Sequence, residues 1–282
     1  MQILVSYLGN IDMVKYEEGT RMGKRKAFTL IELLVVIAII SVLLAILMPA
    51  MRKIKEIARE TTCRSNLRSV GLAVQMYLDD YDRKIPHTSS SNQHQWFESD
   101  GFTYRKPGSS GTYWGIYYRD YIKDQTKIFG CPSFQNTAGT RLIYNYSGSE
   151  KSTNPDYVIQ HAAFGLNHHS RARNRNVETI YRPSEFIYCL DHAEPRPDGG
   201  TSDCLHNNNN PGAMNLTSYR QGGSRSYSYR QIFRHNVRYS DPYRTGGRTN
   251  VLWVDGHVTS IEETTGDNIP LSYYTGDKED RF

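Results

Sequence analysis

One carboxylate, Glu32, stands inside a run of apolar residues that extends over positions 28–48. Thr29 and Ser41 are the other non-apolar residues of this run. Insertion of a carboxylate at bilayer depth costs about 2.5–3.5 kcal/mol of free energy, and somewhat less near the edge of the bilayer. A helix that only anchors a protein in the membrane would not need such a residue. Its natural chemistry is an ion pair, because a cation in the same low-dielectric layer offsets desolvation and fixes a register between two chains.

The apolar run itself predicts a membrane-spanning helix. About 21 residues at about 1.5 Å of rise span about 31 Å, the thickness of a bilayer core. A secretory signal peptide would place a small-residue cleavage site after the run, whereas here Pro49 leads directly into a helical pattern with Arg52 and Lys53. The basic residues 24–26 precede the run and stay cytoplasmic by the positive-inside rule, so everything after residue 48 is expected on the far side.

Residues 24–40 read KRKAFTLIELLVVIAII. This stretch resembles the class III signal of type IV prepilins and type II secretion pseudopilins. The resemblance implies that a membrane-embedded prepilin peptidase cuts between Ala27 and Phe28, that Phe28 becomes N-methylated, and that Glu32 is the filament-assembly acid. The residue before the cut is usually Gly in that family, so with Ala27 we expect equal or slower processing.

The position of Glu32 defines its expected role in a filament. When subunits pack, the new terminal ammonium of Phe28 lies in the same low-dielectric layer as Glu32 of a neighbouring subunit, and each charge is costly alone. Pairing them offsets desolvation and sets the axial register. The resemblance therefore implies three kinds of partner: the prepilin peptidase, other pilin or pseudopilin subunits, and an inner-membrane assembly platform.

The chain is expected to have four regions. Residues 1–27 form a leader that the peptidase removes, and 1–21 are an upstream extension if Met22 is the true start. The others are a transmembrane and filament-core helix (28–48), its amphipathic continuation (49–84) and an exported globular β-rich domain (85–282). Removal of the leader lowers the net charge from +5 to about +3, too little to argue for nucleic-acid binding.

The continuation of the helix carries an amphipathic stripe. Its members lie four and three residues apart: Cys63, Leu67, Val70, Val74, Tyr77 and Tyr81. This spacing predicts one buried helix face, the spine on which the domain packs. Pro49 is expected to kink the helix or to melt one turn, and Pro86 should end it near residues 81–84.

Three segments resemble pseudopilin-like proteins of planctomycete-type and lentisphaeral bacteria. They are residues 63–81, the Cys-Pro-Ser element at 131–133, and the C-terminal segment from His235 to the Asp255-Gly256 turn. Residues 239–245 look like an insertion within the last segment. This insertion weakens the expectation that His235 and Asp255 meet.

Short apolar runs, each bounded by turn-forming residues, predict strands at 142–146, 157–160, 186–190 and 251–254. The Asp255-Gly256 turn predicts a hairpin that joins 251–254 to 257–261, and Ile128 ahead of the Cys-Pro-Ser element predicts a strand that ends in a turn. The expected fold class is α+β and pilin-like, with a long N-terminal hydrophobic helix as a spine packed against a loop-rich antiparallel β-sheet domain.

Four cysteines follow the membrane span: Cys63, Cys131, Cys189 and Cys204. An even number in a compartment that permits disulfides allows three connectivities. We favour Cys63 with Cys131, which would tie the spine to the domain, and Cys189 with Cys204, which would close a short loop. The alternative is that the four are free, buried thiols.

Metal-ligating residue types are present but scattered. The candidates for zinc are Cys189, Asp191, His192, Cys204, His206, His168, His169, His235 and His257, and they lack the paired spacing of structural zinc sites. Oxygen ligands for calcium could come from Asp191, Asp198, Asp203 and residues 207–210, without calcium-loop spacing. We expect neither a metal nor a cofactor, with calcium as the remaining alternative.

The sequence predicts a structural subunit rather than an enzyme, because it has no nucleophile elbow, phosphate loop or paired-carboxylate motif. We expect a pseudopilin of a type II secretion pseudopilus or a type IV pilus-like filament. It would first be a single-pass protein of the bacterial inner membrane with a periplasmic domain, and then part of a periplasmic or cell-surface filament. The 21 tyrosines leave an alternative, a membrane-anchored surface module that binds polysaccharide or DNA; a metal-dependent exported enzyme ranks third.

Overall fold

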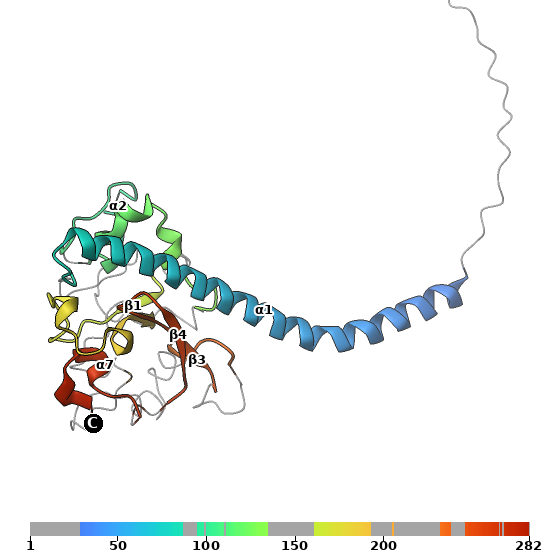
Figure 1. The fold of residues 1–282 in the computed structure, drawn as a ribbon. Helices are drawn as coiled ribbons and strands as arrows, with labels where there is room; N and C mark the ends of the chain where they lie inside the picture. Colours follow the sequence, from blue (N-terminus) through green and yellow to red (C-terminus); the bar gives the residue numbers. More distant parts are fainter. Residues whose placement is uncertain are drawn as a thin grey trace, which may run out of the picture. The chain divides into compact units, whose positions relative to one another are not determined.

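The computed structural model describes residues 29–86, 95–98, 100–109, 111–134, 161–192, 205, 232–237, 246–264, 266 and 268–281. The chain divides into two compact units, Met1–Ala50 and Met51–Phe282. The first contains the start of helix α1, and the second contains the rest of that helix and all other elements (Figure 1).

Helix α1 spans Leu30–Asp80, and Pro49 lies inside it without interrupting the helical structure. The predicted melting of a turn at Pro49 is therefore wrong, while a kink there stays a prediction. The first part of α1 is long and apolar enough to cross a membrane, with a window of mean hydropathy 3.2. Its large apolar side chains are exposed, from 45% at Val36 to 87% at Leu30, as a segment that packs against lipid or other chains requires.

The second part of α1 buries one face. Five of the six predicted stripe residues are buried: Cys63, Leu67, Val70, Val74 and Tyr77. Tyr81 is instead exposed, because α1 ends at Asp80 and the next residues leave the helix, with left-handed φ values of 51° at Asp82 and 57° at Arg83. The helix thus ends just before the predicted window, and the Tyr81 ring stacks on Tyr77 with centroids 4.3 Å apart.

Within the described residues, the sheet has four antiparallel strands in the order β1 (Phe164–Leu166), β2 (Ile187–Asp191), β3 (Arg248–Trp253) and β4 (Val258–Glu262). Strand β2 confirms the strand predicted at 186–190, shifted by one residue. Strands β3 and β4 form the predicted hairpin, with Leu252 paired to Val258 and a φ of 94° at Gly256. The α+β class is confirmed. Strand β1 was not predicted, and the strands predicted at 142–146 and 157–160 lie outside the described residues.

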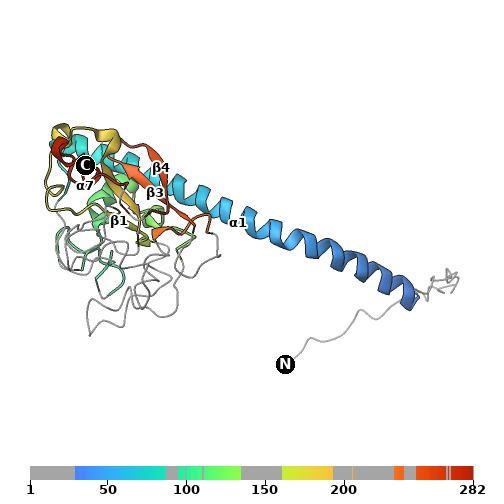
Figure 2. The ribbon, with the colours of Figure 1, turned by 90° about the horizontal axis from the view of Figure 1, so that it is seen from below.

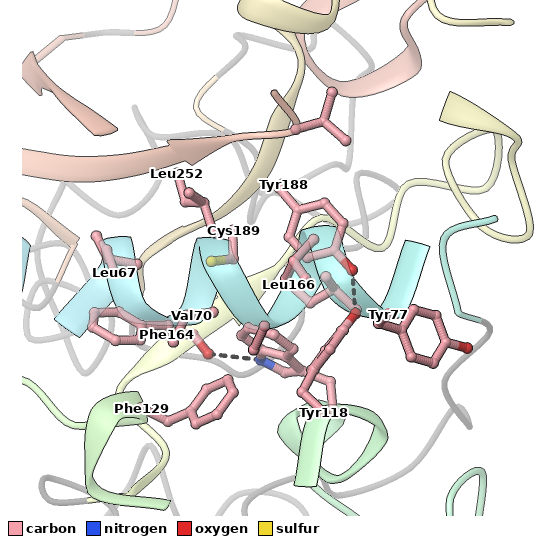
Figure 3. Close-up of a cluster of buried hydrophobic side chains, with 14 of the residues drawn as sticks. Leu67, Val70, Tyr77, Tyr118, Phe129, Phe164, Leu166, Tyr188, Cys189 and Leu252 are labelled. Atoms are coloured by element: carbon pink, nitrogen blue, oxygen red, sulfur yellow. Dashed lines mark hydrogen bonds between the residues drawn. The ribbon is translucent and has the colours of Figure 1, made fainter. Parts of the chain in front are cut away.

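Short helices cover the side of α1 that faces away from the sheet (Figures 1 and 3). They are η1 (Trp114–Tyr118), α2 (Arg119–Ile122) and η2 (Thr126–Phe129). The strand predicted before Cys131 is therefore wrong, since a short apolar run does not distinguish a strand from a buried helical turn. The other helical turns are η3 (Val177–Thr179), η4 (Pro183–Glu185), α7 (Ser272–Thr275) and η6 (Lys278–Arg281).

The core surrounds α1 on both of these sides (Figure 3). Leu252 and Cys189 of the sheet meet the helix face from one side, and Phe129 and Tyr118 from the other. Strands β3 and β4 run beside α1 in both ribbon views (Figures 1 and 2). Their approach is close, because a Cβ added at Gly71 of α1 would lie 2.9 Å from Leu252 Cδ1.

Candidate functional site

The N-terminal end of α1 is closed by a capping box. Glu32 Oε2 accepts hydrogen bonds from the backbone N–H and the hydroxyl of Thr29, both at 2.9 Å. The Thr29 Oγ1 in turn accepts from the Glu32 N–H at 3.2 Å. These reciprocal bonds satisfy backbone donors that have no partner within the helix. Thr29 was not predicted to have a role, although Thr-x-x-Glu ahead of an apolar run is the sequence signature of this motif.

The capping box places the Glu32 carboxylate at the exposed start of α1. Ala27 and Phe28 lie outside the described residues, so the cut between them and the pairing of Phe28 with Glu32 stay predictions. A cationic group of another chain could therefore pair with a carboxylate whose orientation is already fixed by hydrogen bonds from Thr29.

A second group of reactive side chains is buried in the domain. Cys63 of α1, Cys131 just after η2, Asp191 at the end of β2 and His235 ahead of β3 each offer one metal-ligating atom, and these atoms lie within 4.8 Å of one another. All four residues are at most 1% exposed. We call them, together with Arg234, the buried polar cluster. From the sequence we expected no metal site, and these ligand types belonged to separate disulfide and metal hypotheses.

Asp191 is the centre of the buried polar cluster. Its Oδ1 accepts hydrogen bonds from Arg234 Nη2 at 2.6 Å and Nε at 3.1 Å, and from the Cys63 thiol at 3.2 Å. Its Oδ2 accepts from the Asn250 N–H at 2.8 Å and lies 3.0 Å from His235 Nε2. Burial raises the pKa of Asp191, but the charges of Arg234 and His235 outweigh it and hold this pKa below the usual range. Asp191 is therefore a buried carboxylate anion.

The two thiols of the cluster differ in acidity. Burial, with the neighbouring Cys131 and Asp191, raises the pKa of Cys63 well above its usual value. Burial also acts to raise the pKa of Cys131, but the hydrogen bond with Cys63 and the charge of Arg234 outweigh it and lower this pKa. Cys131 Sγ lies 3.6 Å from His235 Nε2. The cluster thus combines a weakly acidic thiol (Cys63) and a more acidic thiol (Cys131) with the side chains of Asp191 and His235.

Backbone contacts hold the cluster residues in place. His235 and Arg248 exchange N–H···O bonds of 3.1 and 2.8 Å, which attaches the His235 segment to the start of β3. A Cβ added at Gly247 would lie 2.9 Å from the His235 carbonyl oxygen, so only glycine allows this approach without a shift. Asn66 of α1 donates to the Gly130 carbonyl at 2.9 Å, which fixes the turn that carries Cys131.

The cysteines are free thiols at Cys63, Cys131 and Cys189. The predicted Cys63–Cys131 disulfide is therefore not formed in this structure, although the two residues lie in one cluster. Besides their mutual hydrogen bond, each Sγ atom contacts a polar partner, Asp191 for Cys63 and His235 for Cys131. Cys204 lies outside the described residues, so its pairing with Cys189 stays a prediction.

The remaining candidate residues do not join the cluster. His257 Nδ1 lies 2.6 Å from Asp255 Oδ1 at the hairpin turn, where both side chains are partly exposed. His235 pairs with Asp191 rather than with Asp255, in line with the weakened expectation that His235 and Asp255 meet. Asp198, Asp203, His206 and residues 207–210 lie outside the described residues, so calcium binding there stays untested.

The family described as "Prokaryotic N-terminal methylation motif" matches residues 22–48, which include the capping box and the exposed apolar part of α1. The N-terminal part of the chain is therefore similar to that of type IV pilin-like proteins. The family described as "Protein of unknown function (DUF1559)" matches residues 52–126, which follow this segment. The "Competence protein ComGC" of Halalkalibacterium halodurans is 38% identical over 56 residues, which cover 20% of this chain and 55% of that protein. The match thus spans about half the length of this curated relative, and no solved structure matches the chain.

Proposed function

We propose that this pilin-like protein is a structural subunit of a type II secretion pseudopilus or a type IV pilus-like filament. Prepilin peptidase cuts the precursor between Ala27 and Phe28 and methylates the new N-terminus of Phe28. The first part of α1 then leaves the inner membrane for the filament core, while the domain stays outside the membrane. The assembly platform and other pilin-like subunits are its partners.

The observation that carries this proposal is the start of α1. An apolar helix segment with exposed side chains carries one carboxylate, Glu32, within its first turn. A single chain gives this segment no apolar partner within the described residues, so it needs lipid or the same segment of other subunits to cover it. In the filament core the Phe28 ammonium of one subunit pairs with Glu32 of the next, which removes the cost of burying either charge alone.

Glu32→Val tests the pairing in cells that express the full chain. The variant should be processed normally, with a mature chain that begins at N-methylated Phe28 by mass spectrometry, but should form few or no fibres. Thr29→Val is the matched control, because it removes the hydroxyl of the capping box and leaves the carboxylate. Loss of a cap costs about 0.5–2 kcal/mol, so this control should still assemble.

Normal fibres from Glu32→Val would exclude the pairing. A mature N-terminus other than Phe28 would exclude the proposed cut, and an uncleaved chain in wild-type fibres would exclude processing altogether. The alternative of a surface module for polysaccharide or DNA was suggested chiefly by the tyrosines between 219 and 243, which lie outside the described residues, so no observation favours it.

A further inference from the structure

We propose that Cys63, Cys131, Asp191 and His235 bind one Zn²⁺ ion in a closed, structural site that fastens helix α1 to the sheet. The four ligand atoms come from four separate segments of the chain, and all four side chains are buried. This assignment is independent of the filament proposal, because it concerns the interior of the domain.

The size of the cluster matches a tetrahedral zinc site. Zinc bonds of about 2.3 Å to sulfur and about 2.0–2.1 Å to nitrogen or oxygen place neighbouring ligand atoms about 3.3–3.8 Å apart. The contacts between neighbouring ligand groups are of similar size: 3.2 Å from Cys63 Sγ to Asp191 Oδ1, 3.6 Å from Cys131 Sγ to His235 Nε2, and 3.0 Å from His235 Nε2 to Oδ2, the other oxygen of Asp191. One of the two Asp191 oxygens would bind the ion. All four atoms stay within 4.8 Å of one another. Small adjustments of the side chains would therefore complete the coordination.

The ligand set selects zinc by its chemistry. Two thiolates, one imidazole and one carboxylate are the ligand types that tetrahedral Zn²⁺ prefers, whereas calcium and magnesium require mostly oxygen. Four protein ligands fill a tetrahedral shell, so the ion has no open position for substrate. The site is accordingly structural and not catalytic, which agrees with a chain whose sequence carries no catalytic motif.

Arg234 completes the electrostatics of the proposed site. Two thiolates and one carboxylate carry one negative charge more than Zn²⁺ neutralises, and the guanidinium of Arg234, 2.6 Å from Asp191 Oδ1, balances it. Arg234 also donates to the Ala163 carbonyl at 2.7 Å, and the Asn250 N–H fixes the other carboxylate oxygen. Such outer hydrogen bonds orient ligands in metal sites. The site therefore has an orienting shell as well as ligands.

A Cys63–Cys131 disulfide is the competing fate of the same thiols. It would use two of the four ligands and leave the Asp191, Arg234 and His235 charges buried beside a neutral bond. The zinc site uses all four, and it accounts for the meeting of a carboxylate and an imidazole with both sulfurs. The two fates exclude each other and can be told apart by mass.

The test uses the detergent-solubilised full chain, purified without chelator and then offered Zn²⁺ or Co²⁺. We expect one tightly bound zinc per chain by elemental analysis, with two sulfur and two nitrogen or oxygen neighbours by X-ray absorption. Cobalt should give the thiolate charge-transfer band of a tetrahedral site. Cys131→Ala and His235→Ala should each weaken zinc binding by at least about 10–100-fold.

Cys189→Ala is the matched control, because Cys189 is a third buried thiol, on strand β2, outside the ligand set. It should keep the zinc stoichiometry and the cobalt spectrum. Two results would overturn the assignment: a wild-type chain that binds no zinc more tightly than Cys131→Ala does, or peptide mapping that finds Cys63 joined to Cys131 in the freshly purified protein. The zinc content and the cobalt spectrum of the wild-type chain test the site by themselves. The test therefore still works if one of the variants fails to fold.

Discussion

Replacement of Asp191 by Asn should destabilise the domain severely, even without metal. The change keeps the shape of the side chain but removes the negative charge that faces Arg234 and His235. Asp191 is 0% and Arg234 4% exposed, so water cannot solvate the cation that remains. The perturbation therefore leaves a buried guanidinium without its counter-ion.

The magnitude follows from the contacts that are lost. The carboxylate of Asp191 accepts two charge-assisted hydrogen bonds from Arg234 and faces His235 Nε2 at 3.0 Å. Removal of one partner from such a buried pair costs about 3–5 kcal/mol. A typical domain has a free energy of unfolding of about 5–15 kcal/mol, so Asp191→Asn should remove a large share of it.

Equilibrium unfolding in denaturant, with a chelator present, measures this loss. The fluorescence of Trp96 and Trp114 reports on the domain, because both rings are fully buried. Asp255→Asn is the matched control: Asp255 also faces a histidine, at 2.6 Å, but with both side chains partly exposed. Exposed pairs contribute about 0–1 kcal/mol, so the control should unfold nearly like the wild type.

A second substitution tests the stated cause. In the Asp191→Asn background, Arg234→Met removes the stranded cation and should recover part of the lost stability, as replacement of buried ion pairs by apolar residues does elsewhere. Two results would show that the unpaired Arg234 cation is not the cause: Asp191→Asn losing no more stability than Asp255→Asn, or Arg234→Met adding a further loss of stability to Asp191→Asn.

Two further predictions concern the packing and the C-terminal ion pairs. Leu67→Ala should lower the free energy of unfolding by about 2–5 kcal/mol because Leu67 is fully buried, whereas Leu72→Ala, at 70% exposure, should change it by at most about 0.5 kcal/mol; equal effects would contradict the buried face of α1. Burial raises the pKa of Asp277, but Arg175 and Arg171 outweigh it and lower this pKa, so the stabilisation by Asp277 is complete above the usual carboxyl pKa and is lost as pH falls through the folded value. Denaturation of wild type and Asp277→Asn at several pH values should therefore show a difference at neutral pH that vanishes in acid; a constant difference would contradict this pairing.

The helix and the hairpin were predictable because their signals are local. The stripe from Cys63 to Tyr77 repeats at helical spacing, and the Asp255-Gly256 turn lies directly between two apolar runs. Such patterns depend on residues a few positions apart. Strand β1 has three residues, Phe164–Leu166, and too short a run to show any period, so its place in the sheet depends on pairing with β2.

The buried polar cluster could not be predicted because none of its signals is local. Cys63 and Asp191 are 128 residues apart, and Cys131 and His235 are 104 apart. Ligand-spacing rules detect pairs of ligands within one turn or hairpin, and no two members of the proposed ligand set share one. The even cysteine count did suggest that Cys63 and Cys131 meet, which was correct in position, but it gave no reason to place Asp191 and His235 beside them.

The buried polar cluster also explains how α1 keeps its register against the sheet. Leu67, Val70 and Val74 are similar in size, so their contacts alone discriminate poorly between neighbouring registers, and within the apolar face it is chiefly the close approach of Gly71 to Leu252 that opposes a shift. A shift of α1 by one turn would move Cys63 about 5.4 Å along the axis, away from Asp191, and it would also break the 3.2 Å contact between Glu60 of α1 and Arg248 of β3. Polar contacts of this kind cost stability but specify one arrangement. A double replacement of Glu60 and Cys63 by Ala should therefore leave the domain folded but lower the protection of α1 amides from hydrogen exchange, and unchanged protection would show that the apolar face sets the register by itself.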